Sequence, residues 1–157
     1  MTYILLGKDT RTNRWGFAKG KGERGEDLIR TASRELEEEF HINISVNNLS
    51  TYPCLIETGM CRAGVHVFAI FAVKTPWMSE DIFIEKAYSV YDDLTLFDYQ
   101  WVPLWKIVAG HAQIDIEPYV MKFINEAINR GILHTSSEFS DKNIKKYSLD
   151  KKSFVIA

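Results

Sequence analysis

Apolar residues recur at helical spacing in two stretches of the chain. Residues three and four positions apart lie on one face of a helix, so this spacing predicts a buried stripe. It predicts helices over residues 27–40 and 118–130, where Pro118 suits the first turn of the second helix and Gly131 its end. The two stripes are Ile29, Ala32, Leu36 and Phe40, and Val120, Phe123, Ile124, Ala127 and Ile128.

Short runs rich in β-branched and aromatic residues predict strands between and around these helices. The runs are residues 2–6, 49–57, 65–73, 88–91 and 99–104. Residues 59–64 suit a turn, and the three glycines within residues 19–26 favour a loop before the first helix. At 157 residues, this alternation fits an α/β domain of the α+β kind with a single core.

The C-terminal part differs in character from the rest. From residue 134 the chain is polar and lysine-rich, and it ends in the apolar run Phe154-Val155-Ile156-Ala157. We therefore divide it into a domain over residues 1–133 and a basic tail over residues 134–157. Residues 153–156 are expected to dock as a strand that fills an open edge of the sheet of that domain.

The charge is unevenly distributed. The net charge of -2 argues against a protein held on nucleic acid by its overall field. Residues 8–24, however, hold six positive and two negative side chains, whereas residues 26–39 hold six negative and two positive ones. A basic loop thus leads into an acidic helix.

The apolar runs also bear on localisation. The longest, such as residues 65–73, are too short to cross a bilayer, and we identify no signal peptide. The two cysteines lack a metal-ligand pattern and fit free thiols in a reducing compartment. The sequence predicts a cytoplasmic protein without a membrane partner.

Three glutamates in the first helix are candidate metal ligands. Glu35, Glu38 and Glu39 stand at i, i+3 and i+4, which places their carboxylates on one face. Like charges at this spacing each cost a few tenths of a kcal/mol, so a cation is expected nearby. Carboxylate oxygens suit Mg²⁺ or Mn²⁺. The alternative is a solvated acidic face near a helix end.

The residues around this trio resemble the Nudix box. From Gly20 the chain reads Gly, five residues, Glu26, seven residues, and then Arg-Glu-Leu-Glu-Glu-Glu-Phe-His-Ile over residues 34–42. Every fixed position matches except the last glycine, which is His41 here. We interpret His41 as a local backbone adjustment just past the helix end, where a left-handed conformation is often required.

The resemblance implies a fold and a ligand set. The fold would be an α/β/α sandwich with a mixed β-sheet, in which the box forms a loop-helix-loop. The metal would be held by Glu35, Glu38 and Glu39 with the backbone carbonyl of Gly20.

The same resemblance implies further roles. Glu38 or Glu35 would deprotonate the attacking water, and Arg34 would pair with Glu26 to orient the helix and its carboxylates. A plain surface ion pair is the alternative for that pair.

Other residues near the box are candidates for substrate and metal contacts. Lys19 and Lys21 flank Gly20 and would contact substrate phosphate oxygens, although Lys19 could equally be a solvated side chain. Many Nudix enzymes carry an additional acid at the position that is Thr95 here. The acids nearest to it are Asp92, Asp93 and Asp98.

The substrate class rests on a shorter likeness. Residues 15–21, Trp-Gly-Phe-Ala-Lys-Gly-Lys, are similar to the run before the box in the decapping and dinucleoside-polyphosphate branches, where proline usually stands at the position of Ala18. We rank cap-like or dinucleoside polyphosphates first, including a capped RNA 5′ end. Nucleotide sugars, ADP-ribose and nucleoside triphosphates follow.

Two other classes of protein compete with a Nudix hydrolase. One is a non-catalytic Nudix-like module that senses a nucleotide or binds a protein, although such a module need not retain all three glutamates. The other is an RNA-binding protein that uses the basic tail, which by itself would bind weakly and in a salt-sensitive way. The sequence does not decide the oligomeric state; a homodimer is one expectation.

Overall fold

The computed structural model describes residues 1–61, 64–89, 96–135 and 152–156. Six strands form one sheet with the order β2-β1-β6-β4-β3, and β5 pairs with β1 off this path. The strands are β1 (Thr2–Asp9), β2 (Trp15–Gly16), β3 (Cys54–Cys61), β4 (Gly64–Thr75), β5 (Leu96–Pro103) and β6 (Lys152–Ile156). β6 runs parallel to β1 and every other pair is antiparallel, so the sheet is mixed, as predicted.

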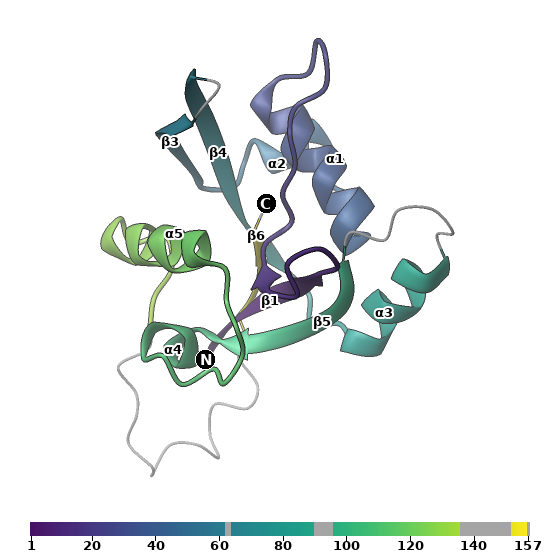
Figure 1. Ribbon diagram of the computed structural model, residues 1–157, viewed down its shortest axis with the longest axis vertical. Coiled ribbons are helices and arrows are strands. Elements are labelled where there is room, and N and C mark those ends of the chain that lie inside the picture. Colours follow the sequence, from purple (N-terminus) through teal and green to yellow (C-terminus); the bar gives the residue numbers. More distant parts are fainter. Residues whose placement is uncertain (62–63, 90–95, 136–151, 157) are drawn as a thin grey trace.

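Helices cover both faces of this sheet. They are α1 (Leu28–Phe40), α2 (Val46–Leu49), α3 (Glu80–Ser89), α4 (Leu104–Val108) and α5 (Pro118–Asn129). Figure 1 shows α1 and α3 on one side and α4 and α5 on the other. This arrangement confirms the expected α/β/α layers. In the described parts of the chain, no helix has the length and apolarity needed to cross a membrane.

The core divides into two clusters because side chains alternate along β1. Leu5 faces α1 and α3, where it joins Leu36 and Phe83. Its neighbours Ile4 and Leu6 point to the opposite face and pack in the cluster that includes residues of α4 and α5. Ile4, Leu5 and Leu6 are all fully buried. β1 is therefore the central strand on which both layers rest.

Capping residues explain where α1 begins and ends. Asp27 is the N-cap, and its side chain accepts a hydrogen bond of 2.9 Å from the amide of Arg30. At the other end His41 has φ 55° and ψ 31°, and its amide donates to the carbonyl of Glu37. The left-handed backbone expected at His41 is confirmed. The helix thus ends as if a glycine stood there.

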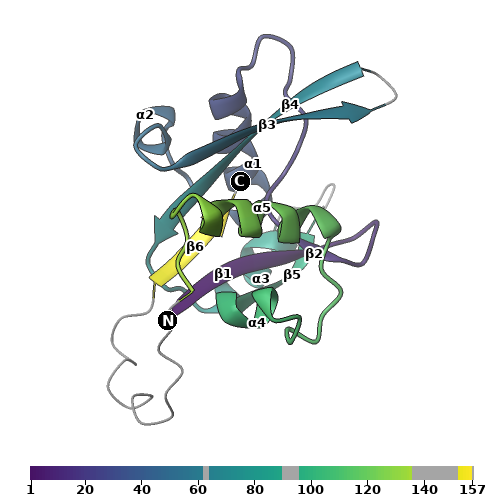
Figure 2. The ribbon, with the colours of Figure 1, turned by 90° about the vertical axis from the view of Figure 1, so that its left-hand side faces the viewer.

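The C-terminal strand lies inside the sheet. β5 pairs with β1 along residues 3–9, which occupies one edge of β1. The other edge is shared by β6, next to residues 2–4, and β2, next to residues 7–8. On its far side β6 pairs with residues 72–75 of β4, and Figure 2 shows it beside β1. The segment docks in the sheet as a strand, as expected, but it lies between two strands and not at an open edge.

Other predicted boundaries also need correction. The strand expected over residues 49–57 begins at Cys54, because residues 46–49 form α2 with Ser45 as N-cap. Within the turn expected over residues 59–64, residues 59–61 belong to β3 and Gly64 belongs to β4; residues 62–63 lie outside the described parts. Residues 88 and 89 end α3 instead of starting a strand, and residues 90–91 are not described. Most of the predicted polar tail, residues 136–151, also lies outside them.

Candidate metal and phosphate site

Arg34 is the centre of a hydrogen-bond network on α1. Its Nε donates to Glu26 Oε1 at 2.9 Å, and its Nη2 donates to Glu26 Oε2 at 3.1 Å. Its Nη1 donates to Glu35 Oε1 at 2.7 Å and to Glu38 Oε2 at 3.0 Å. Nη2 also donates to the carbonyl of Lys21 at 2.9 Å. One guanidinium thus ties the loop to two of the three glutamates.

Glu26 is held by more than this pair. Its Oε2 accepts from the amide of Glu23 and from the hydroxyl of Thr31, each at 2.9 Å. The Arg34 guanidinium, helped by these donors, lowers the pKa of Glu26 to about 2. Glu26 therefore stays ionised and keeps Arg34 in place. The hydrogen bonds from Glu23 and Thr31 distinguish Glu26 from a simple surface ion pair, which would have Arg34 as its only partner.

Glu39 is a buried carboxylate turned toward the loop. Its exposure is 7%, and its Oε2 accepts a 2.9 Å hydrogen bond from the amide of Lys19. The hydroxyl of Tyr99 donates to the Glu39 carbonyl at 2.6 Å and fixes the backbone behind it. Burial raises the pKa of Glu39 to about 8, and nearby Glu35 adds to the rise. A positive charge at this carboxylate would offset the desolvation.

Glu35 is equally buried and lies against Gly20. Its exposure is 7%, and a Cβ on Gly20 would overlap its carboxylate. Only glycine lets the loop backbone approach so closely. Burial raises the pKa of Glu35, although Arg34 opposes the rise. The Lys19–Gly20 backbone therefore lies against the carboxylates of both Glu35 and Glu39.

Glu38 differs from the other two glutamates. Its side chain is 55% exposed and its hydrogen bond to Arg34 is the i,i+4 contact. In the described residues, the structure contains no point on which three acidic, histidine or cysteine side chains converge. The helix thus brings the predicted glutamates to one region without gathering them into a ready-made ligand cluster.

The donor types at this site nonetheless suit a hard divalent cation. Glu35 and Glu39 supply carboxylate oxygens, and the backbone of Gly20 passes close to Glu35. Both buried carboxylates carry a raised pKa, which a bound cation would reverse by favouring the ionised form. The residues present therefore fit Mg²⁺ or Mn²⁺ by chemistry and burial.

The two lysines of the loop have different surroundings. Lys19 is exposed, and its Nζ lies 4.5 Å from the ring centroid of Tyr119. Lys21 is also exposed, and its carbonyl accepts from Arg34. Both contacts leave the ammonium groups accessible to a phosphate.

Several residues that bear on the site were not identified from the sequence. Thr31 and Tyr99 support Glu26 and Glu39, and Tyr119 contacts the loop from α5. Asp9, 4% exposed, lies near enough to Glu39 to raise its pKa further. Thr31 lies within the box and Asp9 lies in β1 before it, whereas Tyr99 and Tyr119 are far from it along the chain, so only the fold reveals their contacts.

The sequence assigns no additional acid near residue 95, where Thr95 stands. Asp98 is described, and its Oδ1 accepts from the neighbouring amide of Tyr99 at 2.8 Å. Asp92, Asp93 and Thr95 lie outside the described residues.

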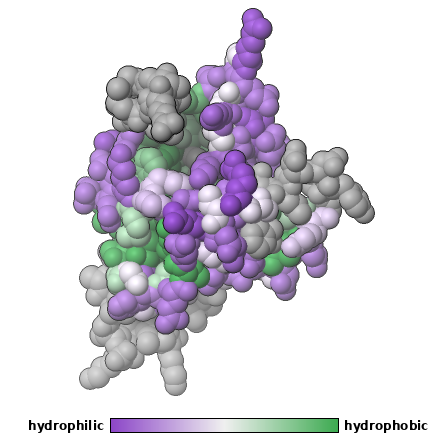
Figure 3. Space-filling view, in the orientation of Figure 1, coloured by the Kyte–Doolittle hydropathy of each residue, from purple (hydrophilic) through white to green (hydrophobic). Residues whose placement is uncertain are grey.

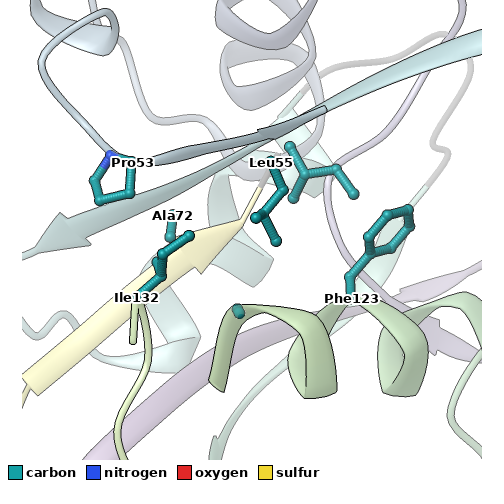
Figure 4. A pocket seen from close by; sticks show the side chains of 7 residues that line it. Pro53, Leu55, Ala72, Phe123 and Ile132 are labelled. Carbon is teal, nitrogen blue, oxygen red and sulfur yellow. The ribbon is translucent and has the colours of Figure 1, made fainter. Parts of the chain in front are cut away.

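The candidate site is distinct from a small apolar pocket elsewhere in the molecule. Figure 3 shows hydrophilic residues gathered over α1 and the loop before it. Figure 4 shows a small pocket between α5 and the β3–β4 pair, lined by Leu55, Phe123 and Ile132 among other apolar residues. With no polar group to hold a phosphate, this pocket does not suit a nucleotide.

Comparison with known families identifies a matching domain model. The NUDIX domain family model matches residues 2–122, which span β1 through the first part of α5. Comparison with curated protein sequences finds no match.

Proposed function

Because the chain belongs to the Nudix family, we propose that it is a metal-dependent pyrophosphohydrolase that cleaves the diphosphate linkage of a nucleoside diphosphate joined to another moiety. Members of this family generally act on nucleoside diphosphate-linked substrates and use divalent metals such as Mg²⁺. The general class, a Nudix hydrolase, follows from the family. The substrate and the role of each residue are our proposals.

One observation carries the proposal most directly. The Lys19–Gly20 backbone lies against two buried carboxylates, Glu35 and Glu39, both with a raised pKa. Ionising a buried acid costs free energy, and the contacts from Arg34 to Glu35 and from Lys19 to Glu39 offset this cost only in part, because the pKa of both acids stays raised. A bound cation would compensate the remainder.

Glu35, Glu38 and Glu39, with the carbonyl of Gly20, would hold the metal. When bound, Mg²⁺ or Mn²⁺ would polarise the phosphoryl oxygens and neutralise charge on the attacking and leaving oxygens. Arg34 and Glu26 position the helix face that carries these ligands, since Arg34 contacts both Glu35 and Glu38.

The reaction proposed is attack of water on one phosphorus of a P–O–P unit. Glu35 or Glu38 accepts a proton from the water as its oxygen bonds to phosphorus, and the bond from that phosphorus to the bridging oxygen breaks. Glu38 is the more exposed of the two, whereas Glu35 is the more desolvated. Lys19 and Lys21 place their ammonium groups where substrate phosphates would be bound.

Cap-like or dinucleoside polyphosphates are the preferred substrates, including a capped RNA 5′ end. The support is the run of residues 15–21. In the structure this run holds the buried Trp15 and Phe17 before the exposed Lys19. Nucleotide sugars, ADP-ribose and nucleoside triphosphates are the next candidates.

A panel of these compounds tests the function. The parent protein is incubated with each compound and MgCl₂ or MnCl₂, and the phosphate-containing products are separated and identified. We expect cleavage of at least one P–O–P linkage that stops when the metal is chelated. Absence of turnover on every compound would favour the non-catalytic, nucleotide-sensing alternative.

Two variants of α1 make the test specific. Glu39→Gln keeps the shape of a buried side chain and removes its charge, so turnover should fall by at least about a hundredfold, as when a catalytic electrostatic contact is lost. Glu37→Gln makes the same charge change at an exposed position of the same helix and should behave like the parent. Equal losses in both variants would contradict a special role for Glu39.

A further inference from the structure

Tyr119 reaches the loop of the candidate site from α5, on the opposite side of the sheet from α1. We propose that Tyr119 is a positioning residue that sets Lys19 through two separate parts of its side chain. Its hydroxyl fixes the backbone that orients Glu39, and its ring holds the Lys19 ammonium where a substrate phosphate binds. This inference rests on the proposed function and adds a residue outside the Nudix box.

The hydroxyl of Tyr119 is built into the loop backbone. The amide of Phe17 donates a 2.9 Å hydrogen bond to Tyr119 Oη. A Cβ on Gly16 would overlap the same oxygen, so the backbone fits closely around it. Phe17 is 3% exposed, and its ring meets Tyr119 edge to face at 5.8 Å. Without the hydroxyl, the Phe17 amide would be left buried and unpaired.

This anchor lies two residues before the contact with Glu39. The amide of Lys19 donates to Glu39 Oε2 at 2.9 Å, and the next residue, Gly20, lies against Glu35. A displacement of Phe17 is carried along the chain to both of these contacts because only Ala18, itself buried, separates them. The Tyr119 hydroxyl therefore governs the placement of the carboxylates that we assign to the metal.

The ring of Tyr119 acts on a different group. Lys19 Nζ lies 4.5 Å from the ring centroid, within the range of a cation–π contact. Lys19 is exposed, so its ammonium can hold this position and meet a phosphate from solvent. The ring is itself braced by Phe123, whose centroid lies 6.2 Å away. The two contacts of Tyr119 should thus be separable by substitution.

Two substitutions separate them. Tyr119→Phe keeps the ring and removes the acceptor, so Mn²⁺ binding, measured by electron paramagnetic resonance without substrate, should weaken by at least about fivefold. Its affinity for imidodiphosphate, measured calorimetrically at saturating Mg²⁺, should stay within about twofold of the parent. Tyr119→Leu removes both contacts and should also weaken imidodiphosphate binding by about two- to fivefold.

Three controls make the result decisive. In a Lys19→Met background, Tyr119→Leu should cause no further loss of imidodiphosphate affinity. Gly16→Ala, which places a methyl group against the hydroxyl, should weaken Mn²⁺ binding as Tyr119→Phe does. Tyr52→Phe removes a hydroxyl that donates to the Lys74 carbonyl, a contact between residues outside this loop, and should match the parent in both measurements.

The outcomes distinguish this inference from the proposed function. If the parent binds Mn²⁺ and hydrolyses a substrate but Tyr119→Phe binds Mn²⁺ equally well, the positioning role is overturned and the function stands. If Tyr119→Leu weakens imidodiphosphate binding equally with and without Lys19, the role of the ring is overturned. A parent that binds no Mn²⁺ overturns both proposals. Should Tyr119→Leu fail to fold, Tyr119→Phe and Gly16→Ala still decide the role of the hydroxyl.

Discussion

At the scale of single residues, the buried Glu39 carboxylate makes stability depend on pH when no metal is bound. Its pKa rises from 4.5 to about 8 on folding, so the folded chain retains a proton that the unfolded chain has lost between these values. The stabilisation of the folded state by this bound proton is fully present below pH 4.5 and is lost as the pH rises through about 8. We therefore expect the melting temperature in chelator to fall between pH 5 and pH 8.5.

Glu39→Gln is the matched variant for this prediction. Its amide is neutral at every pH and can still accept from Lys19, so its melting temperature should change less with pH and exceed that of the parent near pH 8.5. The difference should be on the order of a few kcal/mol in free energy of unfolding. Identical pH slopes in the two proteins would show that Glu39 is not desolvated as described.

Glu26 leads to a different prediction because its pKa is lowered. The stabilisation that ionised Glu26 gives the folded state is present above its ordinary pKa of 4.5 and is lost only as the pH falls toward about 2. This loss lies outside the range of pH 5 to 8.5 considered for Glu39. Glu26→Gln removes the charge that holds Arg34, so turnover should drop by about 10- to 100-fold while the ligands themselves remain. Glu23→Gln, an exposed neighbour in the same loop, is the control and should retain parent turnover. Parent-like rates in Glu26→Gln would argue against a positioning role.

The candidate site could be proposed from the sequence, whereas the contacts that support it could not. The spacing of the glutamates, Gly20 and Arg34 is local, so a helix and the adjoining loop bring them together whatever the rest of the chain does. The contacts from Tyr99 and Tyr119 join residues 60 and 102 positions apart. No pattern within one segment reveals such pairs.

At the scale of elements, the end of α1 is under local strain. His41 adopts φ 55°, a conformation that is accessible to glycine but costs free energy in residues with a side chain. His41→Gly should raise the free energy of unfolding by about 0.5–1 kcal/mol. This gain is smaller than the full strain because the variant loses the ring contact with Tyr99 and because glycine increases the entropy of the unfolded chain. Thermal unfolding measures this effect, and turnover should stay within about twofold of the parent. A lower melting temperature would mean that the His41 ring outweighs the strain.

Elements with a clear periodicity were the ones that the sequence predicted well. α1 and α5 appear within two residues of their expected bounds because each buries one continuous stripe. α3 was missed: Ile82, Phe83 and Ile84 are consecutive, and only Phe83 is buried, against Tyr99 and Trp101. α2 spans four residues, too few for a helical repeat to appear.

At the scale of the whole molecule, β6 joins the two halves of the sheet. It is the only strand on the described path between β1 and β4, so removing it leaves unpaired backbone on both. Deleting residues 151–157 should lower stability by at least about 3 kcal/mol, which corresponds to a fall of about 6–12 °C in melting temperature. A chain that lacks residue 157 alone is the control. An unchanged melting temperature after the full deletion would reject this role.

The position of β6 shows why topology was harder to predict than local structure. The apolar run at the C-terminus predicts a strand, but its neighbours are set by residues more than 75 positions away. An open edge and an inner position leave the same local pattern. The mixed sheet was expected from the resemblance to the Nudix box, whereas the order of its strands could not be predicted.

The central claim is that Glu35 and Glu39 hold a divalent metal, and Mn²⁺ affinity tests it most directly. Calorimetric titration with MnCl₂ at pH 8, without substrate, compares the parent with Glu35→Gln, Glu39→Gln and the exposed control Glu37→Gln. We predict that the parent and Glu37→Gln bind Mn²⁺ equally, and that each of the other two variants binds at least about tenfold more weakly. Equal affinity in all four proteins, or none in the parent, would contradict the account.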